Sequence, residues 1–341
     1  MLYPLCFWLY SVNSKRVNLV LPGLFKSFQA GEFDVSQASH LKLIQQFFTQ
    51  ATYRCTKDKN TRSFPVDYAT TYSLAAYEDA GSEEPATVLY AEPVNIELKS
   101  DHIVAYPLAI SEPDIETIEN IITQFNQHFS ADGLSLKYLP SGRIICHSSS
   151  PVVAEMTSAY AVYGRDMKHF LPRGEQSAFW LRVTNEVQMF LHEYIEHQDK
   201  LFAGRLLNGF WFFGGGSAVS SDFERDALIS DASWAEGFCQ QHNIERLQLA
   251  DIAASARHNF QLVDESLLLA SSCGDMDLWL TQLAKVETEI LRPLIELLKS
   301  GKITEVNIHD TDETFYQFKN IYKYRFFRKK KSLQDICVVE A

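Results

Sequence analysis

The sequence predicts an α/β fold, and three observations support this class. The apolar run Val17–Leu21 is typical of a buried strand, and the turn at Pro22-Gly23 that ends it is a common opening of an α/β domain. A strongly amphipathic helical pattern begins near Ser111. A long helical pattern over 275–300 leads into an apolar run at 303–308, which we expect to be a late strand.

Length and charge limit the classes of function. The 341 residues suffice for one large α/β domain or two smaller ones, and a hydrophobic content of 46% supplies a packed core. The formal net charge of −12 argues against broad binding to nucleic acid or to an anionic membrane. We therefore expect neither nucleic acid nor a membrane as a partner, and the sequence does not identify a protein partner.

The six cysteines are scattered and contain no CxxC pair. In so long a chain, this spacing favours reduced thiols over a disulfide scaffold or a zinc site. We therefore expect a cytoplasmic protein.

The first residues are apolar but form a short run. Residues 1–14 carry no basic stretch before the apolar part, and a bilayer span needs roughly 20 apolar residues. We expect an extra N-terminal segment, with a weak membrane or partner contact as the alternative.

Two further regions complete the first half of the chain. Ser39–Tyr53 has apolar residues at helical spacing and predicts an amphipathic helix. Residues 88–148 predict a compact unit of three strands, a helix and two strands, in which Ser111 and Asp114 form a capping-box-like helix start and Gly133 ends the helix.

A helix expected over 175–200 has two different faces. Its buried face repeats at steps of three, four or seven, whereas polar residues share the opposite face, namely Asn185, Gln188, His192 and Glu196. These polar residues either form a solvated surface or line a pocket that orients a small polar ligand.

The sequence HEYIEH at 192–197 does not match a zinc-protease helix. That motif needs two histidines four residues apart, but His192 and His197 are five apart, about 140° around a helix. Pairing of His192 with Glu196 and of Glu193 with His197 is the simpler interpretation.

An aromatic strand is expected over Leu206–Phe213, and three glycines end it. Glycines after a strand can let backbone amides approach a phosphate, but neither GxGxxG nor GxxxxGK[ST] is present. The glycines Gly214, Gly215 and Gly216 therefore predict either a tight turn or a loop beside a ligand pocket.

The C-terminal part offers two weak signals. His309-Asp310-Thr311-Asp312 follows the late strand and is interpreted as a turn, with a cation site as the alternative. Basic residues alternate with aromatic ones near Lys323 and continue into a basic tail at 328–341, which favours a solvated edge over RNA stacking.

Several segments resemble bacterial RpfE-type proteins, which are phosphoglycerate-mutase-like. The resemblance covers most of 15–330 and is carried by the segments Val17–Pro22, AEPVNIEL at 91–98, Leu171-Pro172 with Gly174, TNEVQMFLHE at 184–193 and LNGFWFFGGG at 207–216. One departure is Glu92, where we expect an aspartate. The last segment also resembles the NxxWLWGxG segment of archaeal-type cofactor-independent phosphoglycerate mutases.

The resemblance implies an alkaline-phosphatase-like central sheet flanked by helices, with an inserted α+β subdomain. The main α/β domain would comprise 15–90 and 203–327, and the insertion 91–202. The resemblance further implies a ligand pocket with the candidate residues Asn185, Glu186, Gln188, His192, Asn208, Trp211, Gly214, Gly215 and Gly216.

The same resemblance raises doubt about catalysis. Those mutases use a metal pair held by aspartates and histidines, but this chain has Leu21-Pro22-Gly23 where an Asp-Gly ligand is expected, and no DxxGH segment. We expect a degenerate, regulatory or small-anion-binding protein without a metal cofactor. One alternative is an active mutase or related phosphotransfer enzyme that uses manganese or zinc. The other is a scaffold protein that binds no small ligand.

Overall fold

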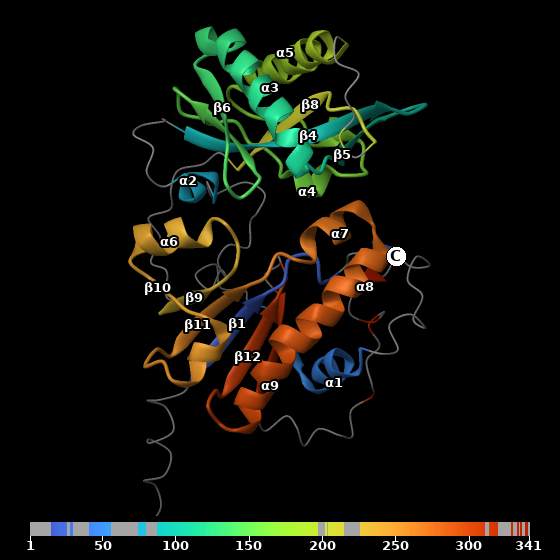
Figure 1. Cartoon of the computed structure of the whole chain (residues 1–341). Coiled ribbons are helices and arrows are strands. Elements are labelled where there is room, and N and C mark those ends of the chain that lie inside the picture. Colours follow the sequence, from blue (N-terminus) through green and yellow to red (C-terminus); the bar gives the residue numbers. More distant parts are fainter. Residues whose placement is uncertain are drawn as a thin grey trace, which may run out of the picture. The chain divides into compact units, whose positions relative to one another are not determined.

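The computed structural model describes residues 15–25, 28–29, 41–55, 74–79, 87–196, 202, 204–214, 226–310, 314–319, 329, 333, 335 and 338–339. Its helices and strands confirm the predicted α/β class, with a central sheet flanked by helices (Figure 1). The predicted segment 1–14 and most of the tail 328–341 lie outside the described residues. None of the helices in the described part is both long and apolar enough to span a bilayer.

The chain divides into two compact units. Unit 1 comprises 1–66, 222–235 and 239–341, and unit 2 comprises 67–221 and 236–238. The domain limits implied by the resemblance, at residues 91 and 202, stay a prediction. Residue 91 lies inside one continuous strand of unit 2.

Unit 1 is built on a seven-stranded sheet with the order β10-β9-β11-β1-β12-β13-β3. The five strands from β10 to β12 are parallel, whereas β13 and β3 are added antiparallel. The strands are β1 (Arg16–Val20), β3 (Thr52–Cys55), β9 (Ala227–Ile229), β10 (Glu245–Arg246), β11 (Asn259–Val263), β12 (Glu305–His309) and β13 (Thr314–Lys319). A separate parallel pair joins β2 (Phe28–Gln29) to β14 (Val338–Val339).

One face of this sheet carries the apolar core of unit 1. Val17 and Leu19 of β1 lie in the same buried cluster as residues of three helices, namely α1 (Lys42–Gln50), α8 (Met276–Lys285) and α9 (Arg292–Lys299). The cluster also takes in η5 (Leu249–Ala253) and α7 (Leu268–Cys273). Burial of these apolar side chains is the main stabilising contribution here.

The predicted long helix at 275–300 is helical without a break from Met276 to Lys299, but its hydrogen-bond pattern changes close to its proline. Asp275 caps α8 by accepting a hydrogen bond from the Leu278 N–H at 2.9 Å, and a π-helical stretch (Val286–Leu291) joins α8 to α9. Pro293, in the first turn of α9, has no N–H to donate, which explains why the regular ladder changes register there. Glu287 of the π-helical stretch accepts from the Ile44 N–H at 2.9 Å and so satisfies the start of α1.

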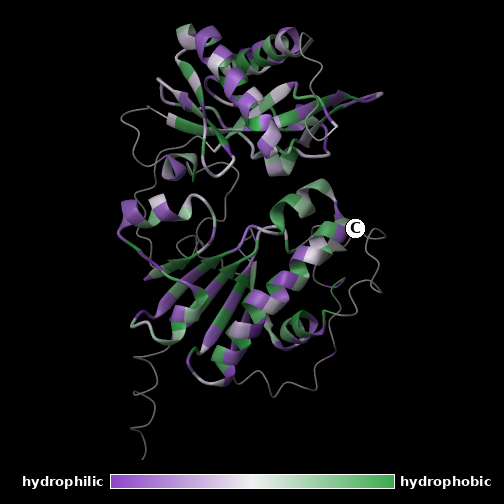
Figure 2. Cartoon of the chain, in the orientation of Figure 1, coloured by the Kyte–Doolittle hydropathy of each residue, from purple (hydrophilic) through white to green (hydrophobic). Residues whose placement is uncertain are grey.

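The other face of the sheet carries a row of polar side chains, most of them buried. Four amide side chains lie at one register across adjacent strands, namely Gln261, Asn18, Asn307 and Gln317. The Asn307 Nδ2 donates to Asn18 Oδ1 at 3.1 Å and to Glu305 Oε1 at 3.0 Å. The alternation of hydrophilic and hydrophobic residues along these strands is visible in Figure 2. A parallel sheet covered on both faces normally carries apolar residues on both, so this amide row is unusual.

Unit 2 contains a five-stranded antiparallel sheet centred on β4 (Thr87–Leu98). β4 pairs with β7 near its start, with β8 through its middle and with β5 at its end, while β6 pairs with β7. These strands are β5 (Ile103–Pro107), β6 (Leu134–Tyr138), β7 (Ile144–Ser148) and β8 (Gly209–Phe213). Three strands are predicted before the helix of this unit, but the first two of them, at 88–90 and 94–98, form one strand, because Ala91 to Pro93 stay extended and pair with β8.

Two helices cover one face of this sheet. They are α3 (Ile115–His128) and α5 (Ser177–Glu196), and their apolar residues share a buried cluster with Leu89, Phe210 and Phe212 of the strands (Figure 1). The predicted capping box at Ser111 and Asp114 is present at the start of the short helix η2 (Glu112–Asp114), which leads into α3. Gly133, at φ 69°, follows η3 (Ser130–Asp132) and turns the chain into β6.

The other face of the unit 2 sheet carries two short helices, α2 (Leu74–Glu78) and α4 (Ala159–Val162). The Tyr90 and Phe213 rings of this face lie 5.3 Å apart, and the Tyr160 ring of α4 lies 6.2 Å from Phe213. The remaining helices are η4 (Met167–His169) in unit 2 and α6 (Ala235–His242). Helix α6 begins only at Ala235, because Ser230 Oγ accepts from the Ala232 N–H at 3.2 Å in a local turn before it.

Candidate functional site

The polar residues predicted on α5 lie on its outer surface. Asn185 and His192 are exposed and Gln188 is partly exposed, whereas Trp180, Val183, Val187 and Leu191 are buried on the opposite side. The Trp180 ring packs against Phe212 of β8 with centroids 5.5 Å apart. The polar face of α5 therefore points away from the strand that carries the other predicted ligand residues.

Glu186 lies in a surface ion pair. Its carboxylate accepts from Arg182 at 2.8 Å, and the same guanidinium donates to Asp132 at 2.7 Å. Both contacts involve partly exposed side chains, so solvent screens them.

Asn208 has a structural contact on β4. Its Oδ1 accepts from the Ile96 N–H at 2.6 Å, and its Nδ2 donates to the Ile96 carbonyl at 2.9 Å. The amide thereby replaces a backbone partner just before β8 begins at Gly209. Both polar atoms of the side chain are engaged in holding the sheet.

Trp211 lines a small apolar cavity. Its indole Nε1 donates to the Thr157 carbonyl at 2.7 Å, and the neighbouring walls include Trp180, Thr184 and Phe212. The cavity is partly open, and its free space is about 10 Å³, which is room for about one water molecule. Gly214 has a φ of 71° and turns the chain after β8, while Gly215 and Gly216 lie outside the described residues.

The carboxyl edge of the unit 1 sheet is the place where parallel α/β sheets usually bind ligands. Asp310, which follows β12, accepts hydrogen bonds from the Gly23 N–H at 3.0 Å and from the Phe25 N–H at 2.7 Å. Gly23 has a φ of 84°, and a Cβ there would lie 2.8 Å from Ser271 Cβ. The turn after β1 is therefore closed on the Asp310 carboxylate.

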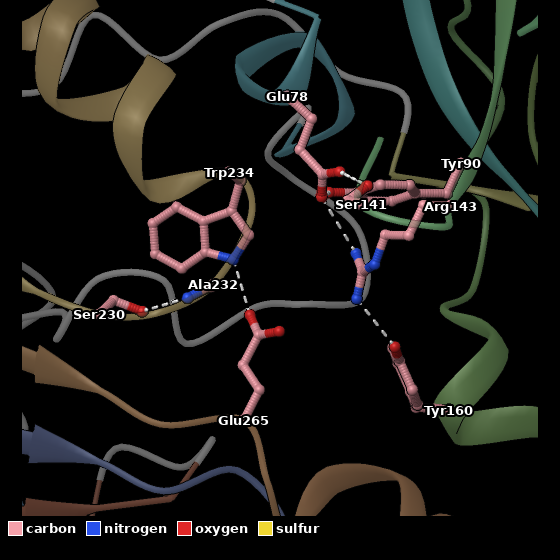
Figure 3. A network of polar contacts seen from close by, with 9 residues as sticks. All are labelled: Glu78, Tyr90, Ser141, Arg143, Tyr160, Ser230, Ala232, Trp234 and Glu265. Carbon is pink, nitrogen blue, oxygen red and sulfur yellow. Dashed lines mark hydrogen bonds and ion pairs between the residues drawn. The ribbon is translucent and has the colours of Figure 1, made fainter. Parts of the chain in front are cut away.

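The acids that follow β11 are also engaged. Asp264 Oδ1 accepts from the Ser266 N–H at 3.1 Å, and Glu265 Oε1 accepts from the indole of Trp234 at 2.7 Å (Figure 3). Within the described residues, no group of three or more His, Cys, Asp or Glu side chains is arranged to hold a metal ion. These residues do not fit the aspartate and histidine set of a two-metal phosphotransfer centre.

A denser polar network lies in unit 2, on the sheet face that carries α2. Figure 3 shows Glu78 between Tyr90, Ser141 and Arg143, with Arg143 also reaching Tyr160. The Tyr90 hydroxyl donates to Glu78 Oε1 at 2.5 Å, Ser141 Oγ donates to Oε2 at 3.0 Å, and Arg143 lies 3.4 Å from Oε1.

Asp79 extends the same network by two basic partners. Lys137 of β6 lies 2.5 Å from its Oδ1, and His147 Nε2 of β7 lies 2.7 Å from its Oδ2. A carboxylate only accepts, so we assign the Nε2 hydrogen to His147. We call the donors Tyr90, Lys137, Ser141, Arg143 and His147 the donor group.

Glu92 of β4 belongs to the same sheet face. Burial raises the pKa of Glu92, the Arg143 guanidinium and a hydrogen bond to Tyr163 oppose this shift, and the Glu78 carboxylate adds to it. A perturbed carboxyl group beside a second acid and an arginine is typical of functional sites as well as of structural ion networks. Sequence spacing gave no signal for this network, because its members come from α2, three strands and a turn.

Comparisons with known proteins identify no family for the chain. No protein-family model matches it, and no curated protein matches it. Among solved structures, it is similar to a cofactor-independent phosphoglycerate mutase from Thermoplasma acidophilum DSM 1728, with a TM-score of 0.38, 12% identity and coverage of 89% of both chains. It is also similar to the PH0037 protein from Pyrococcus horikoshii, with a TM-score of 0.47, 11% identity and coverage of 90% of this chain and 88% of that one. Likenesses this weak carry no argument about activity.

Proposed function

We propose that the chain is a phosphoglycerate-mutase-like protein of the bacterial RpfE type that lacks a metal-dependent phosphotransfer centre. On this proposal it works in the cytoplasm, without a metal cofactor, and has a regulatory role through a small phosphorylated or other anionic ligand. Two kinds of observation support this proposal. The first is the set of motifs that resemble cofactor-independent phosphoglycerate mutases, and the second is the set of contacts around Asp310 and in the donor group.

One observation carries the loss of phosphotransfer. Both oxygens of the Asp310 carboxylate accept backbone hydrogen bonds from the turn that follows β1. A metal-dependent phosphoryl transfer needs carboxylate oxygens that are free to hold the metal ions, and these ions stabilise the attacking and leaving oxygens. The Asp310 carboxylate is instead fixed by two backbone amides and stabilises the turn after β1.

The donor group supports the anion-binding part of the proposal. It holds two carboxylates with a guanidinium, an ammonium, an imidazole and two hydroxyls. The Arg143 guanidinium is fixed further by a 3.1 Å hydrogen bond to Tyr160 and by its position 4.6 Å from the Tyr90 ring centroid. Fixed, charge-assisted donors of this kind bind carboxylate and phosphate groups well.

The experiment measures metal content and turnover of the purified full chain. Conversion of 3-phosphoglycerate to 2-phosphoglycerate is followed with added manganese, cobalt or zinc, beside an active cofactor-independent mutase under the same conditions. We expect neither a stoichiometric metal nor turnover. Turnover that is lost in Asp310→Asn or in Asn208→Ala would make the protein an active metal-dependent mutase and overturn the proposal.

A further inference from the structure

The acids Glu78 and Asp79 occupy the donor group in the manner of a bound ligand. We propose that the donor group is a binding site for a small dicarboxylate, and that the end of α2 fills this site in cis until such a ligand displaces it. This inference rests on the proposed anion-binding function and names the ligand class and the regulation of the site.

The first half of the site recognises one carboxylate with three donors. Tyr90 comes from β4, whereas Ser141 and Arg143 come from the turn between β6 and β7 and its exit. Both oxygens of Glu78 are used, one by Tyr90 and Arg143 and the other by Ser141. This arrangement would accept any carboxylate that reaches the same position.

The second half recognises a second carboxylate with two basic groups. Lys137 and His147 lie on the paired strands β6 and β7 and approach different oxygens of Asp79. Tyr90 of the first half and Lys137 of the second half lie opposite the same residue of β7, Ile145. The two halves of the site are therefore adjacent on the sheet, and a short ligand with an anionic group at each end can reach both. An uncharged analogue would leave the basic groups without counter-charges.

The acids that fill the site are more deeply buried than the basic side chains that bind them. The side chains of Glu78 and Asp79 are only 2% and 5% exposed, whereas Arg143, His147 and Lys137 are 22%, 21% and 48% exposed. The donors stand on strands and a hairpin of the sheet, but the acids stand at the end of a five-residue helix. A helix that short has little stability of its own and depends on its contacts. The site therefore combines a rigid receptor with a weakly self-stabilised occupant.

The test compares binding to the wild-type chain and to Glu78→Gln/Asp79→Asn. Isothermal titration uses glutarate, with acetate and glutaramide as mono-anionic and neutral controls. Since an occupied site lowers the apparent affinity by the fraction that is free, we expect the variant to bind glutarate at least about tenfold more tightly. Adding Arg143→Leu to the variant should abolish this binding.

A matched variant controls for the loss of two charges. Glu97→Gln/Asp101→Asn removes one acid beside a lysine and one beside a histidine on the exposed β4–β5 hairpin of the same unit. We expect it to bind glutarate like the wild type. An equal gain in this control, or no gain in a Glu78→Gln/Asp79→Asn variant with wild-type near-ultraviolet circular dichroism, would overturn the inference.

Hydrogen exchange on the wild-type chain covers the case in which that variant does not fold. Saturating glutarate should speed exchange at the amides of 74–79 and slow it at 134–147. Unchanged exchange in both segments would overturn the inference. Binding of acetyl-Glu-Asp-amide without binding of glutarate would contradict the small-molecule class.

The outcome is separable from that of the proposed function. Metal-dependent mutase turnover would overturn the function proposed above while the glutarate results still decide the cis-occupied site. If there is neither turnover nor any gain in glutarate binding, the proposed loss of the phosphotransfer centre is retained and the proposed dicarboxylate site is rejected.

Discussion

Two regions of the molecule hold carboxylates in opposite ways. At the carboxyl edge of the unit 1 sheet, Asp310 is held by backbone N–H groups of the turn after β1. On the second face of the unit 2 sheet, side chains hold the carboxylates of Glu78 and Asp79.

The difference matters because backbone and side-chain donors respond differently when the acid leaves. A buried backbone N–H that loses its acceptor stays unpaired, which costs stability. The side chains of Lys137, Arg143 and His147 are partly exposed, so water or another anion can reach them where they stand. An acid held by backbone N–H groups is therefore needed for the stability of the fold. An acid held by partly exposed side chains can be replaced by another anion.

The largest expected effect comes from Asp310→Ala. It removes the acceptor of two backbone N–H groups, and charge-assisted hydrogen bonds contribute about 1.5–3 kcal/mol each, so we expect unit 1 to lose about 3 kcal/mol or more. Urea unfolding followed by tryptophan fluorescence measures the loss. Asp310→Asn keeps one acceptor, so its stability should lie between that of the wild type and that of Asp310→Ala. An unchanged unfolding midpoint for Asp310→Ala would contradict the structural role of Asp310.

Asn208→Ala should have the next largest effect. The change removes both hydrogen bonds to the Ile96 backbone, and we expect a loss of about 2 kcal/mol in unit 2. Asn185→Ala on the exposed face of α5 serves as the control and should change stability by less than about 0.5 kcal/mol. Equal losses in the two variants would remove the distinction between them.

Glu78→Gln/Asp79→Asn should cost less than either backbone-linked change. The glutamine and asparagine still accept hydrogen bonds, and the partly exposed donors regain water, so we expect a loss of about 1 kcal/mol. Chemical unfolding measures it. A loss of stability as large as that of Asp310→Ala would show that the fold depends equally on Glu78 and Asp79. The difference between the two regions would then not hold.

The smallest effect concerns pH and Glu92. Because burial raises the pKa of Glu92 in the folded chain above its ordinary value of 4.5, the unfolded chain ionises first as pH rises. Glu92 therefore lowers stability above that ordinary value, and the loss is complete once the pH passes the folded pKa. Glu92→Gln should gain stability relative to wild type at about pH 8 but not at about pH 4. Unfolding midpoints across this range check the sign, and a pH-independent difference would contradict it.

Regular patterns in the sequence predicted much of the fold. The capping box at Ser111 and the apolar stripe of α3 depend on neighbours three or four residues apart, so spacing alone reveals them. The helical pattern over 275–300 is confirmed as well, and its π-helical stretch lies just before Pro293, a residue that lacks the donor the regular ladder needs.

Contacts between distant segments could not be predicted from spacing. The Asn208 clamp joins residues 112 positions apart, and Arg143 meets Glu78 across 65 positions. The amide row of unit 1 depends on the register of four strands, which no local pattern specifies. The polar residues of α5 had two open interpretations because composition does not show which side of a helix a ligand would approach.

The central claim is that the protein binds an anion without a phosphotransfer metal centre. Thermal unfolding of the wild-type chain in rising inorganic phosphate, with chloride of equal ionic strength as control, tests it most directly when repeated with added manganese. A ligand that binds only the folded state raises the melting temperature, so we expect phosphate to raise it without manganese and manganese to add nothing. Protection by phosphate that appears only with manganese would place the anion on a metal ion and contradict the account.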